Sequence, residues 1–160
     1  MTIRLAEAGD VSEILDLQAA NQPDRGGALS AAFSEAWFRT AIGVMPVIVA
    51  RRFRLVGYLV SSTLAAHDGV PVVQAMLAAY RGAADAYVYG PVCVAEEARG
   101  QGTARAMFDA LRAELPGREG VLFIRSDNQA SLRAHAKMGV RRAGEFDHGG
   151  AHYFVLSYIG

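Results

Sequence analysis

The stretch Val92-Cys93-Val94-Ala95-Glu96-Glu97-Ala98-Arg99-Gly100-Gln101-Gly102-Thr103-Ala104 is the most informative part of this chain. An apolar run typical of a β-strand ends in two acidic residues, and a basic residue and two glycines then precede a predicted amphipathic helix. This order places unpaired backbone N–H groups and a guanidinium at a helix N-terminus, where a diphosphate binds well. A side chain at Gly100 or Gly102 would keep the phosphate away from those amides. The stretch therefore predicts a ligand that carries a pyrophosphate.

Other glycine-rich phosphate sites fit this stretch poorly. A Walker loop needs Gly-Lys-Ser/Thr, and no lysine follows Gly102. A Rossmann fingerprint needs a third glycine where Arg105 stands, and an acidic residue at a strand end about 20 residues later. Glu114 and Glu119 fall in that range without ending a predicted strand. The remaining pattern, Arg99-Gly100-Gln101-Gly102-Thr103-Ala104, resembles the Arg/Gln-x-x-Gly-x-Gly/Ala signature of the GNAT superfamily of N-acetyltransferases.

A second motif resembles the same family. A strand-like run at residues 121–125 is followed by Asn128-Gln129-Ala130-Ser131-Leu132-Arg133-Ala134-His135-Ala136-Lys137-Met138-Gly139, which is similar to Asn-x-x-Ala/Ser-x-x-x-Tyr-x-Lys-x-Gly. His135 stands where tyrosine is commonest, and some branches of the family carry histidine there. Asn128, Ser131 and His135 share one side of the predicted helix because they are three and four residues apart. With both motifs in this order, the chain is identified as a member of the GNAT superfamily.

The resemblance implies an α/β fold of the α+β type, with one domain over residues 1–160. It implies a central, mixed, mostly antiparallel sheet of about seven strands flanked by helices. The periodicity predicts strands at residues 3–5, 47–50, 55–63, 87–94 and 121–125, and a hairpin closed at Gly149-Gly150. A first helix is predicted from an Asp10–Glu13 capping box to about Ala20. A second begins at Ser30 and carries Phe33, Trp37 and Ala41 on one side. Two more are predicted, one after Gly102 that ends at Pro116-Gly117 and one over residues 128–138.

Residues 65–85 depart from the family pattern, in which a short turn often joins the third and fourth strands. Pro71 stands near the first turn of a helix predicted by four apolar residues at helical spacing, Val73, Met76, Leu77 and Tyr80. This helix would either cover the hydrophobic core or have a functional role. That role would be in dimerisation or in acceptor binding, where the helix could form one wall of the acceptor cleft. Both interpretations stay open.

The resemblance implies an enzyme, an acyltransferase that moves an acetyl group from acetyl-CoA to a primary amine of a small molecule by direct attack in a ternary complex. No metal is expected. The implied pyrophosphate contacts are Arg99 and the amides of Gly100, Gly102, Thr103 and Ala104. The backbone of Val92 and Val94 would pair with the pantetheine arm, and Asn128 and Ser131 would contact the cofactor further along. From the residues alone, both valines could be plain core, Asn128 a helix cap and Ser131 a solvated side chain.

Two positions are implied to be catalytic, Val94 through its amide as oxyanion donor and His135 through its side chain. The tyrosine usual at position 135 donates a proton to the departing coenzyme A. A free thiol has a pKa of about 8.5 and histidine one of about 6.5, so an imidazolium would be the stronger acid. His135 could instead pack beneath the cofactor, with Tyr87, Tyr89 or Tyr153 as donor. The general base is open among Glu96, Asp85, His67 and a water molecule.

Composition limits the partners. Sixteen acidic and sixteen basic residues cancel, which gives no electrostatic case for nucleic acid or an anionic membrane. The arginines at 51, 52, 54, 141 and 142 form either a local patch or a solvated strand edge. Cys93 is the single cysteine and Met1-Thr2-Ile3-Arg4-Leu5 carries no apolar signal region, so a cytoplasmic location is expected. The hairpin would place His152 opposite Asp147 as a charge pair rather than a metal ligand set.

Two other functions remain open at this stage. One is a coenzyme-A-binding sensor or interaction module without transferase activity, because no glutamate stands in the fourth predicted strand before Glu96. The other is a protein or peptide N-acetyltransferase. A homodimer is possible, since the resemblance and soluble proteins in general favour one.

Overall fold

The chain forms a mixed seven-stranded sheet in a computed structural model that describes residues 1–27, 29 and 31–160. The strands lie in the order β1-β2-β3-β4-β5-β7-β6. β1–β2, β2–β3, β5–β7 and β6–β7 are antiparallel, whereas β4–β5 is parallel. The expected α+β class with a mixed, mostly antiparallel sheet is confirmed.

The strands are β1 (Thr2–Leu5), β2 (Val47–Arg51), β3 (Leu55–Thr63), β4 (Tyr87–Val94), β5 (Glu119–Arg125), β6 (Arg141–His148) and β7 (Ala151–Ile159). The α-helices are α1 (Val11–Ala20), α2 (Glu35–Val44), α3 (Pro71–Ala79), α4 (Thr103–Glu114) and α5 (Gln129–Lys137). Short 3-10 helices are η1 (Ala8–Asp10), η2 (Pro23–Arg25), η3 (Leu64–His67) and η4 (Glu96–Ala98). Within the described residues, no helix combines the length and apolar character that crossing a membrane requires.

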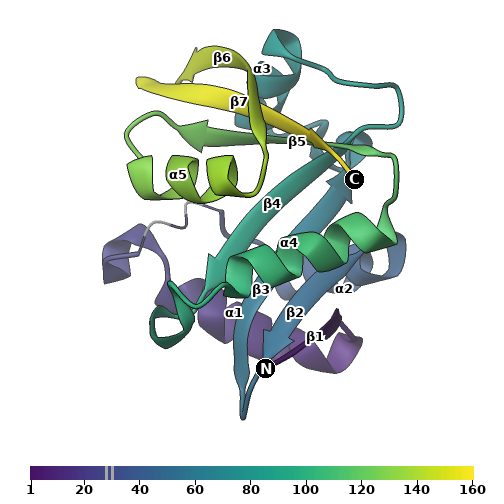
Figure 1. Ribbon diagram of the computed structural model, residues 1–160, viewed down its shortest axis with the longest axis vertical. Coiled ribbons are helices and arrows are strands. Elements are labelled where there is room, and N and C mark those ends of the chain that lie inside the picture. The colour runs from purple at the N-terminus through teal and green to yellow at the C-terminus, as the bar shows by residue number, and fades with distance from the viewer. Residues whose placement is uncertain (28, 30) are drawn as a thin grey trace. The chain divides into compact units, whose positions relative to one another are not determined.

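The chain divides into two compact units, unit 1 with Met1–Ser62 and Gly90–Glu114, and unit 2 with Thr63–Tyr89 and Leu115–Gly160. In unit 1, α4 lies in front of the strands and α1 and α2 lie behind them (Figure 1). Val11 and Ile14 of α1 pack with Phe38 of α2 in a buried cluster that reaches the strands. Gly57 lets α4 approach β3, because a Cβ there would lie 3.1 Å from the Met107 methyl group. Both helical layers of unit 1 are therefore fixed by close packing.

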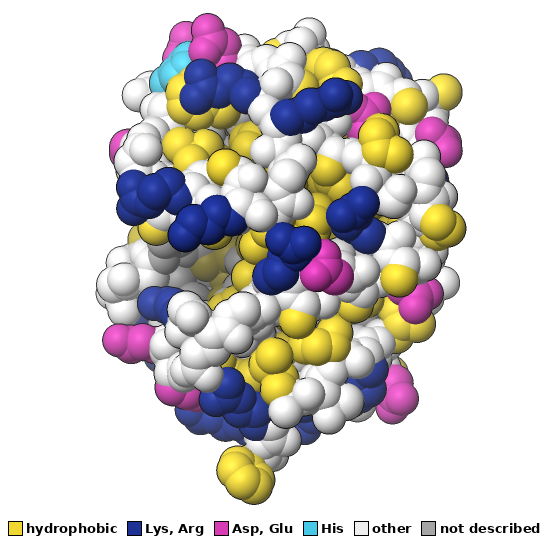
Figure 2. Space-filling view, viewed as in Figure 1, with side chains coloured by type: hydrophobic (Ala, Val, Ile, Leu, Met, Phe, Trp, Pro, Cys, Tyr) yellow, Lys and Arg dark blue, Asp and Glu magenta, His cyan; other side chains and the backbone are white. Residues whose placement is uncertain are grey.

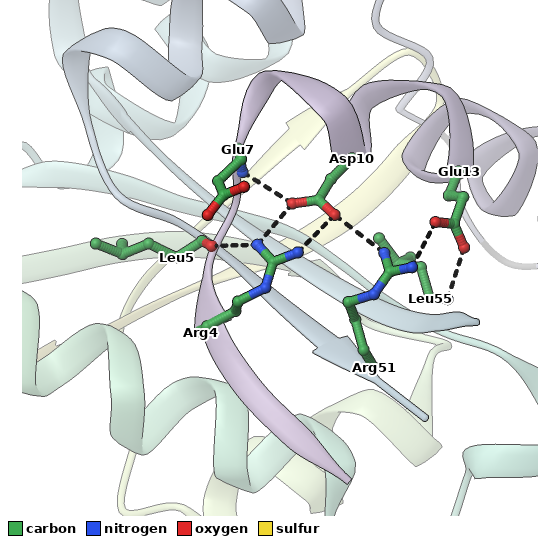
Figure 3. A network of polar contacts seen from close by, with 7 residues as sticks. All are labelled: Arg4, Leu5, Glu7, Asp10, Glu13, Arg51 and Leu55. Atoms are coloured by element: carbon green, nitrogen blue, oxygen red, sulfur yellow. Dashed lines mark hydrogen bonds and ion pairs between the residues drawn. The ribbon is translucent and has the colours of Figure 1, made fainter. Parts of the chain in front are cut away.

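A polar network joins the start of α1 to the ends of β2 and β3 (Figure 3). Asp10 accepts hydrogen bonds from Arg4 at 2.7 and 2.8 Å and from Arg51 at 3.0 Å. Glu13 accepts from Arg51 at 2.6 Å and from the Leu55 amide at 2.8 Å. Burial alone would raise the pKa of Asp10, but the Arg4 hydrogen bond and the nearby positive charges hold it below its ordinary value. The network anchors both ends of the β2–β3 turn.

This network corrects the predicted Asp10–Glu13 capping box. Asp10 makes no side-chain cap bond to α1, and the reciprocal capping bonds form one turn earlier, between Glu7 and Asp10 around η1. The Asp10 and Glu13 carboxylates instead bind guanidinium groups, which give charge-assisted hydrogen bonds stronger than those of a neutral cap.

The second helix also begins later than predicted. Ser34 is its N-cap and accepts from the Trp37 amide at 3.1 Å, so α2 starts at Glu35. The predicted cap, Ser30, lies outside the described residues. Phe33 precedes the helix and stacks on Trp37 with ring centroids 3.9 Å apart.

In unit 2, the predicted helix within residues 65–85 is confirmed as α3. Val73 and Met76 are buried in one cluster with Val88 of β4 and Val155 of β7. The helix therefore covers the core of unit 2, and its role in acceptor binding stays a prediction.

A buried carboxylate fixes the chain that follows α3. Glu119 accepts hydrogen bonds from the Tyr80 hydroxyl at 2.6 Å, the Ala83 amide at 2.6 Å and the Ser157 hydroxyl at 2.5 Å. Three donors around one carboxylate compensate for its removal from water. This residue ties the segment between α3 and β4 to β5 and β7.

The register of the β6–β7 hairpin is as predicted. His148 pairs with Ala151 and Asp147 with His152 across the turn. Nδ1 of His152 lies 2.7 Å from an Asp147 carboxylate oxygen, and this hydrogen bond raises the pKa of His152. The expected charge pair is confirmed.

Candidate functional site

The segment between β4 and α4 forms a tight turn in unit 1. Gly100 has φ +69° and Gly102 has φ +77°, in the left-handed region that favours glycine. A Cβ at either position would meet no protein atom within 4 Å. Backbone conformation, rather than crowding by the protein, therefore requires glycine here, and the space beside both residues is open to a ligand.

The start of α4 presents backbone donors beside this turn. The first helical hydrogen bond runs from the Ala106 amide to the Gly102 carbonyl at 2.9 Å. The hydroxyl of the buried Thr103 donates to the Ala98 carbonyl at 3.0 Å, so this side chain braces the turn. The first N–H groups of a helix have no partner within the helix. The amides of Thr103 and Ala104 thus fit an anion, and the structure brings the predicted residues together at one helix end.

Arg99 connects this turn to α1. Its Nη2 donates to the Asn21 side-chain oxygen at 2.6 Å, and its Nε donates to the Val94 carbonyl at 3.1 Å. Both acceptors are uncharged, so these bonds orient the guanidinium without neutralising it. Val92 and Val94 are half-buried, and Cys93 between them is buried. Burial raises the pKa of the Cys93 thiol to about 11, so it stays protonated at neutral pH.

A cavity of about 460 Å³ lies in unit 1 beside these residues. Its charged lining residues are Glu13, Asp16, Glu96, Glu97, Arg25, Arg54 and Arg99. The lining carries charges of both signs, and two of its carboxylates are ion-paired, Glu13 with Arg51 and Glu97 with Arg54. Glu96, one of the candidate bases, is exposed on this lining.

In unit 2, the three predicted residues of α5 lie together. The Asn128 side-chain oxygen accepts from the Ser131 amide at 3.2 Å, which makes Asn128 the N-cap. The Ser131 hydroxyl lies 3.3 Å from Nδ1 of His135. The helix-cap interpretation of Asn128 is therefore correct, and its Nδ2 group is not used by this bond. Ser131 is engaged with His135 rather than simply solvated.

His135 is buried and faces Tyr89 of β4. Nδ1 of His135 lies 2.8 Å from the Ser131 carbonyl, which can only accept, so Nδ1 carries the proton. Nε2 lies 3.2 Å from the Tyr89 hydroxyl and accepts its hydrogen bond in the neutral tautomer. Burial lowers the pKa of His135 below its ordinary value. The resting pair is thus a neutral imidazole and a protonated phenol.

A cluster of tyrosines surrounds this pair. The Tyr87 and Tyr158 hydroxyl oxygens lie 2.6 Å apart, and the Tyr89 and Tyr158 rings meet edge to face at 5.7 Å. Tyr153 is stacked on Phe146 with ring centroids 5.1 Å apart. Tyr89, one of the three alternative donors, is hydrogen-bonded to His135. The alternation Tyr87-Val88-Tyr89 in the sequence indicates that both tyrosines lie on the same strand face, opposite to that of Val88, and this could have predicted that the two are neighbours.

The other two candidate bases also belong to unit 2. Asp85 has an exposed side chain, and its carbonyl accepts from Arg118 at 2.9 Å. His67 is buried in η3, and burial lowers its pKa. The identity of the general base therefore stays open.

Comparisons with known proteins agree with this geometry. Residues 16–140 match the model of the acetyltransferase (GNAT) family. A phosphinothricin acetyltransferase from Sinorhizobium meliloti in complex with acetyl-CoA superposes with a TM-score of 0.70 at 22% identity, covering 99% of this chain and 87% of that one. A ribosomal-protein-alanine N-acetyltransferase from Brucella melitensis gives 0.69 at 19% identity, covering 99% of both chains. YncA from Salmonella typhimurium, with its cofactor acetyl-CoA, superposes with a TM-score of 0.70 at 18% identity, covering 99% of this chain and 93% of that one. A search of curated proteins finds no significant match.

Proposed function

Because the chain belongs to the GNAT acetyltransferase family, we propose that it is an acetyl-CoA-dependent N-acetyltransferase that acetylates a primary amine of a small molecule by direct attack in a ternary complex. The observation that carries this proposal is the turn before α4. Its two left-handed glycines and the amides of Thr103 and Ala104 fit a diphosphate, and two similar structures hold acetyl-CoA.

The residues of the two sequence motifs would hold the cofactor. Arg99 supplies positive charge, and the amides of Gly100, Gly102, Thr103 and Ala104 supply hydrogen-bond donors for the pyrophosphate. The backbone of Val92 and Val94 pairs with the pantetheine arm in this proposal, and Asn128, through its Nδ2 group, and Ser131 contact the cofactor further along. Bound acetyl-CoA supplies the thioester whose acetyl group is transferred. The Val94 amide donates to the reacting carbonyl oxygen.

The Tyr89–His135 pair would move the proton that the reaction displaces. The attacking amine must lose one proton, and the leaving sulfur must gain one. The Tyr89 oxygen accepts a proton while its own proton passes to Nε2 of His135, and the reverse movement returns a proton for the sulfur. This shuttle starts from a neutral imidazole, which is the state that the Ser131 and Tyr89 hydrogen bonds favour. His135 therefore holds the proton between the two halves of the reaction in this proposal, and Tyr89 passes it to the sulfur.

The α3 insertion supports a small acceptor over a protein. Val73 and Met76 fix this helix to the core of unit 2, so it is a rigid addition. In this proposal it narrows the space for an extended peptide. The similar structures include enzymes named for a small molecule and for ribosomal-protein alanine, and their folds do not separate the two classes. Protein N-acetylation is accordingly the second candidate.

Thermal melting with ligands tests the proposal first. A ligand at about 100 times its Kd adds roughly 2.7 kcal/mol, which corresponds to a shift of roughly 5–10 °C for a chain of this size. Acetyl-CoA and desulfo-coenzyme A should both give the shift, whereas ATP and NAD should not. The absence of any shift with either coenzyme would overturn the proposal.

Turnover then separates the remaining functions. Release of free thiol from acetyl-CoA should depend on a small amine in an acceptor panel and should be unaffected by competing peptides. Binding without turnover across the panel would favour a coenzyme-A sensor module. Acetylation of peptide N-termini or lysines in preference to small amines would favour a protein acetyltransferase.

We also propose a cytoplasmic homodimer. The buried, protonated Cys93 thiol is compatible with a reducing compartment. Sedimentation equilibrium at micromolar concentration should give twice the 17.1 kDa chain mass, and a single-chain mass would refute the dimer.

A further inference from the structure

The turn between β2 and β3 exposes an aromatic ring between two arginines. Phe53 is 108% exposed, the most exposed of the large hydrophobic residues in the described chain. The turn is closed by a hydrogen bond from the Arg52 amide to the Arg54 carbonyl at 2.9 Å. In the space-filling view a hydrophobic side chain projects at the lower end, where Figure 1 shows this turn (Figure 2). An aromatic ring held in water without contacts is a candidate for stacking on a ligand.

The residues on either side of this tip are fixed. Arg51 is held by Asp10 and Glu13, and the Leu55 amide donates to Glu13 at 2.8 Å (Figure 3). The three residues between these anchors are therefore presented from a rigid base. A preordered tip loses less conformational entropy on binding than a free loop does.

The tip adjoins the glycine turn before α4. Arg52 donates to the side-chain oxygen of Gln101, which stands between Gly100 and Gly102. Gln101 in turn donates to the Glu97 carbonyl at 2.7 Å, and Arg54 forms an ion pair with the Glu97 carboxylate. The β2–β3 tip and the proposed diphosphate site therefore form one continuous surface of unit 1.

This surface carries an excess of positive charge. Two guanidinium groups, those of Arg52 and Arg54, lie near the single carboxylate of Glu97. A backbone hydrogen bond lowers the pKa of Glu97 most, and the two arginines lower it further. The Arg52 guanidinium donates to the uncharged side-chain amide of Gln101, which leaves its charge unneutralised by that contact. A second phosphate would thus be attracted to the tip.

We propose that the Arg52-Phe53-Arg54 tip binds the nucleotide end of coenzyme A, with the Phe53 ring stacked on the adenine and Arg52 paired with the 3′-phosphate. This inference rests on the proposed function, because it extends the same cofactor site beyond the pyrophosphate. Base–aromatic stacking and a charge-assisted phosphate contact each contribute about tenfold in affinity.

Calorimetric titration with coenzyme A and with 3′-dephospho-coenzyme A tests the proposal. The wild-type chain should bind coenzyme A about tenfold more tightly than the dephospho form. Arg52→Gln should remove that difference, and Phe53→Ser should weaken binding of both ligands about tenfold. The controls are Arg39→Gln and Val44→Ser on α2, which remove an exposed charge and an exposed apolar group and should leave both affinities unchanged.

The outcomes separate this inference from the function on which it rests. Wild-type binding of coenzyme A that neither tip variant alters would overturn the nucleotide site and leave the acetyltransferase proposal standing. No binding of coenzyme A by the wild-type chain would overturn both. Unchanged affinities together with binding to phosphatidylserine vesicles that Phe53→Ser abolishes would assign the tip to a membrane surface instead. Because the side chains are exposed, both variants should keep the melting temperature of the wild type.

Discussion

The hydroxyl of Tyr89 lies 3.2 Å from Nε2 of His135, and the Ser131 carbonyl fixes the proton of that ring on Nδ1. The contact joins β4 to α5, and three elements, η4, α4 and β5, separate the two in the sequence. Its direction is set by the neutral tautomer, with Tyr89 donating and His135 accepting. Burial raises the pKa of Tyr89 and lowers that of His135, so both effects preserve this neutral state around pH 7.

We expect Tyr89→Phe to reduce kcat about 100-fold, because it keeps the ring but removes the hydroxyl that carries the proton in the proposed shuttle. Tyr153→Phe is the matched control, since that hydroxyl lies outside the pair, and it should retain wild-type turnover. Steady-state rates with acetyl-CoA and the best amine make the comparison. Equal kcat values for Tyr89→Phe and the wild type would eliminate the shuttle.

The pH profile gives an independent test of the same pair. The shuttle needs neutral His135, so kcat should fall as the pH drops through the His135 pKa, which lies below the ordinary value of about 6.5. His135→Gln should lower kcat and remove this acid limb. An acid limb that persists unchanged in His135→Gln belongs to another group, and the assignment of the proton carrier would then be wrong.

At the tip of the β6–β7 hairpin we expect His152 to titrate above its ordinary pKa, because its protonated ring is hydrogen-bonded to Asp147. Asp147→Asn should lower the His152 pKa in a titration followed by NMR, whereas Asp127→Asn, in the turn before α5, should not. The folded pKa is raised, so the stabilisation is fully present below the unfolded pKa of about 6.5 and is lost as the pH rises through the folded value. An identical His152 titration in Asp147→Asn would contradict the pair.

Features set by neighbouring residues could be predicted from the sequence. The β6–β7 register follows from Gly149-Gly150, since a two-residue turn dictates which residues face each other. The glycine turn before α4 likewise depends on residues adjacent in sequence, and its two glycines indeed have positive φ. In both places, the local chemistry allows few alternatives.

Features set by distant residues could not be predicted in this way. Asp10 and Glu13 have the spacing of a capping box, but Arg51, from another strand, binds both carboxylates. The Tyr89–His135 contact depends on how α5 packs on β4, which neither motif encodes. The network around Asp10 shows the physical reason, because Arg51 reaches the Asp10 and Glu13 carboxylates only once β2 has packed beside α1.

We expect Gly102→Ala to destabilise the chain by about 1 kcal/mol, because an L-residue is strained at φ +77° although its Cβ meets no protein atom. Gly43→Ala is the matched control. Gly43 lies inside α2 with open space around it, so alanine should stabilise the helix by up to about 1 kcal/mol. Urea unfolding measures both changes. A stabilising effect of Gly102→Ala would show that this backbone conformation is not required.

We expect Glu119→Ala to destabilise the chain by about 2–4 kcal/mol, because the Tyr80 hydroxyl, the Ala83 amide and the Ser157 hydroxyl would all lose their acceptor. Tyr80→Phe removes a single bond and should cost only about 1 kcal/mol. Urea unfolding again gives the free energies, and the double variant should be less destabilised than the sum of the two, since both changes remove the same bond. If the two losses simply add, Tyr80 and Glu119 act independently, and the carboxylate does not tie the segment after α3 to the sheet.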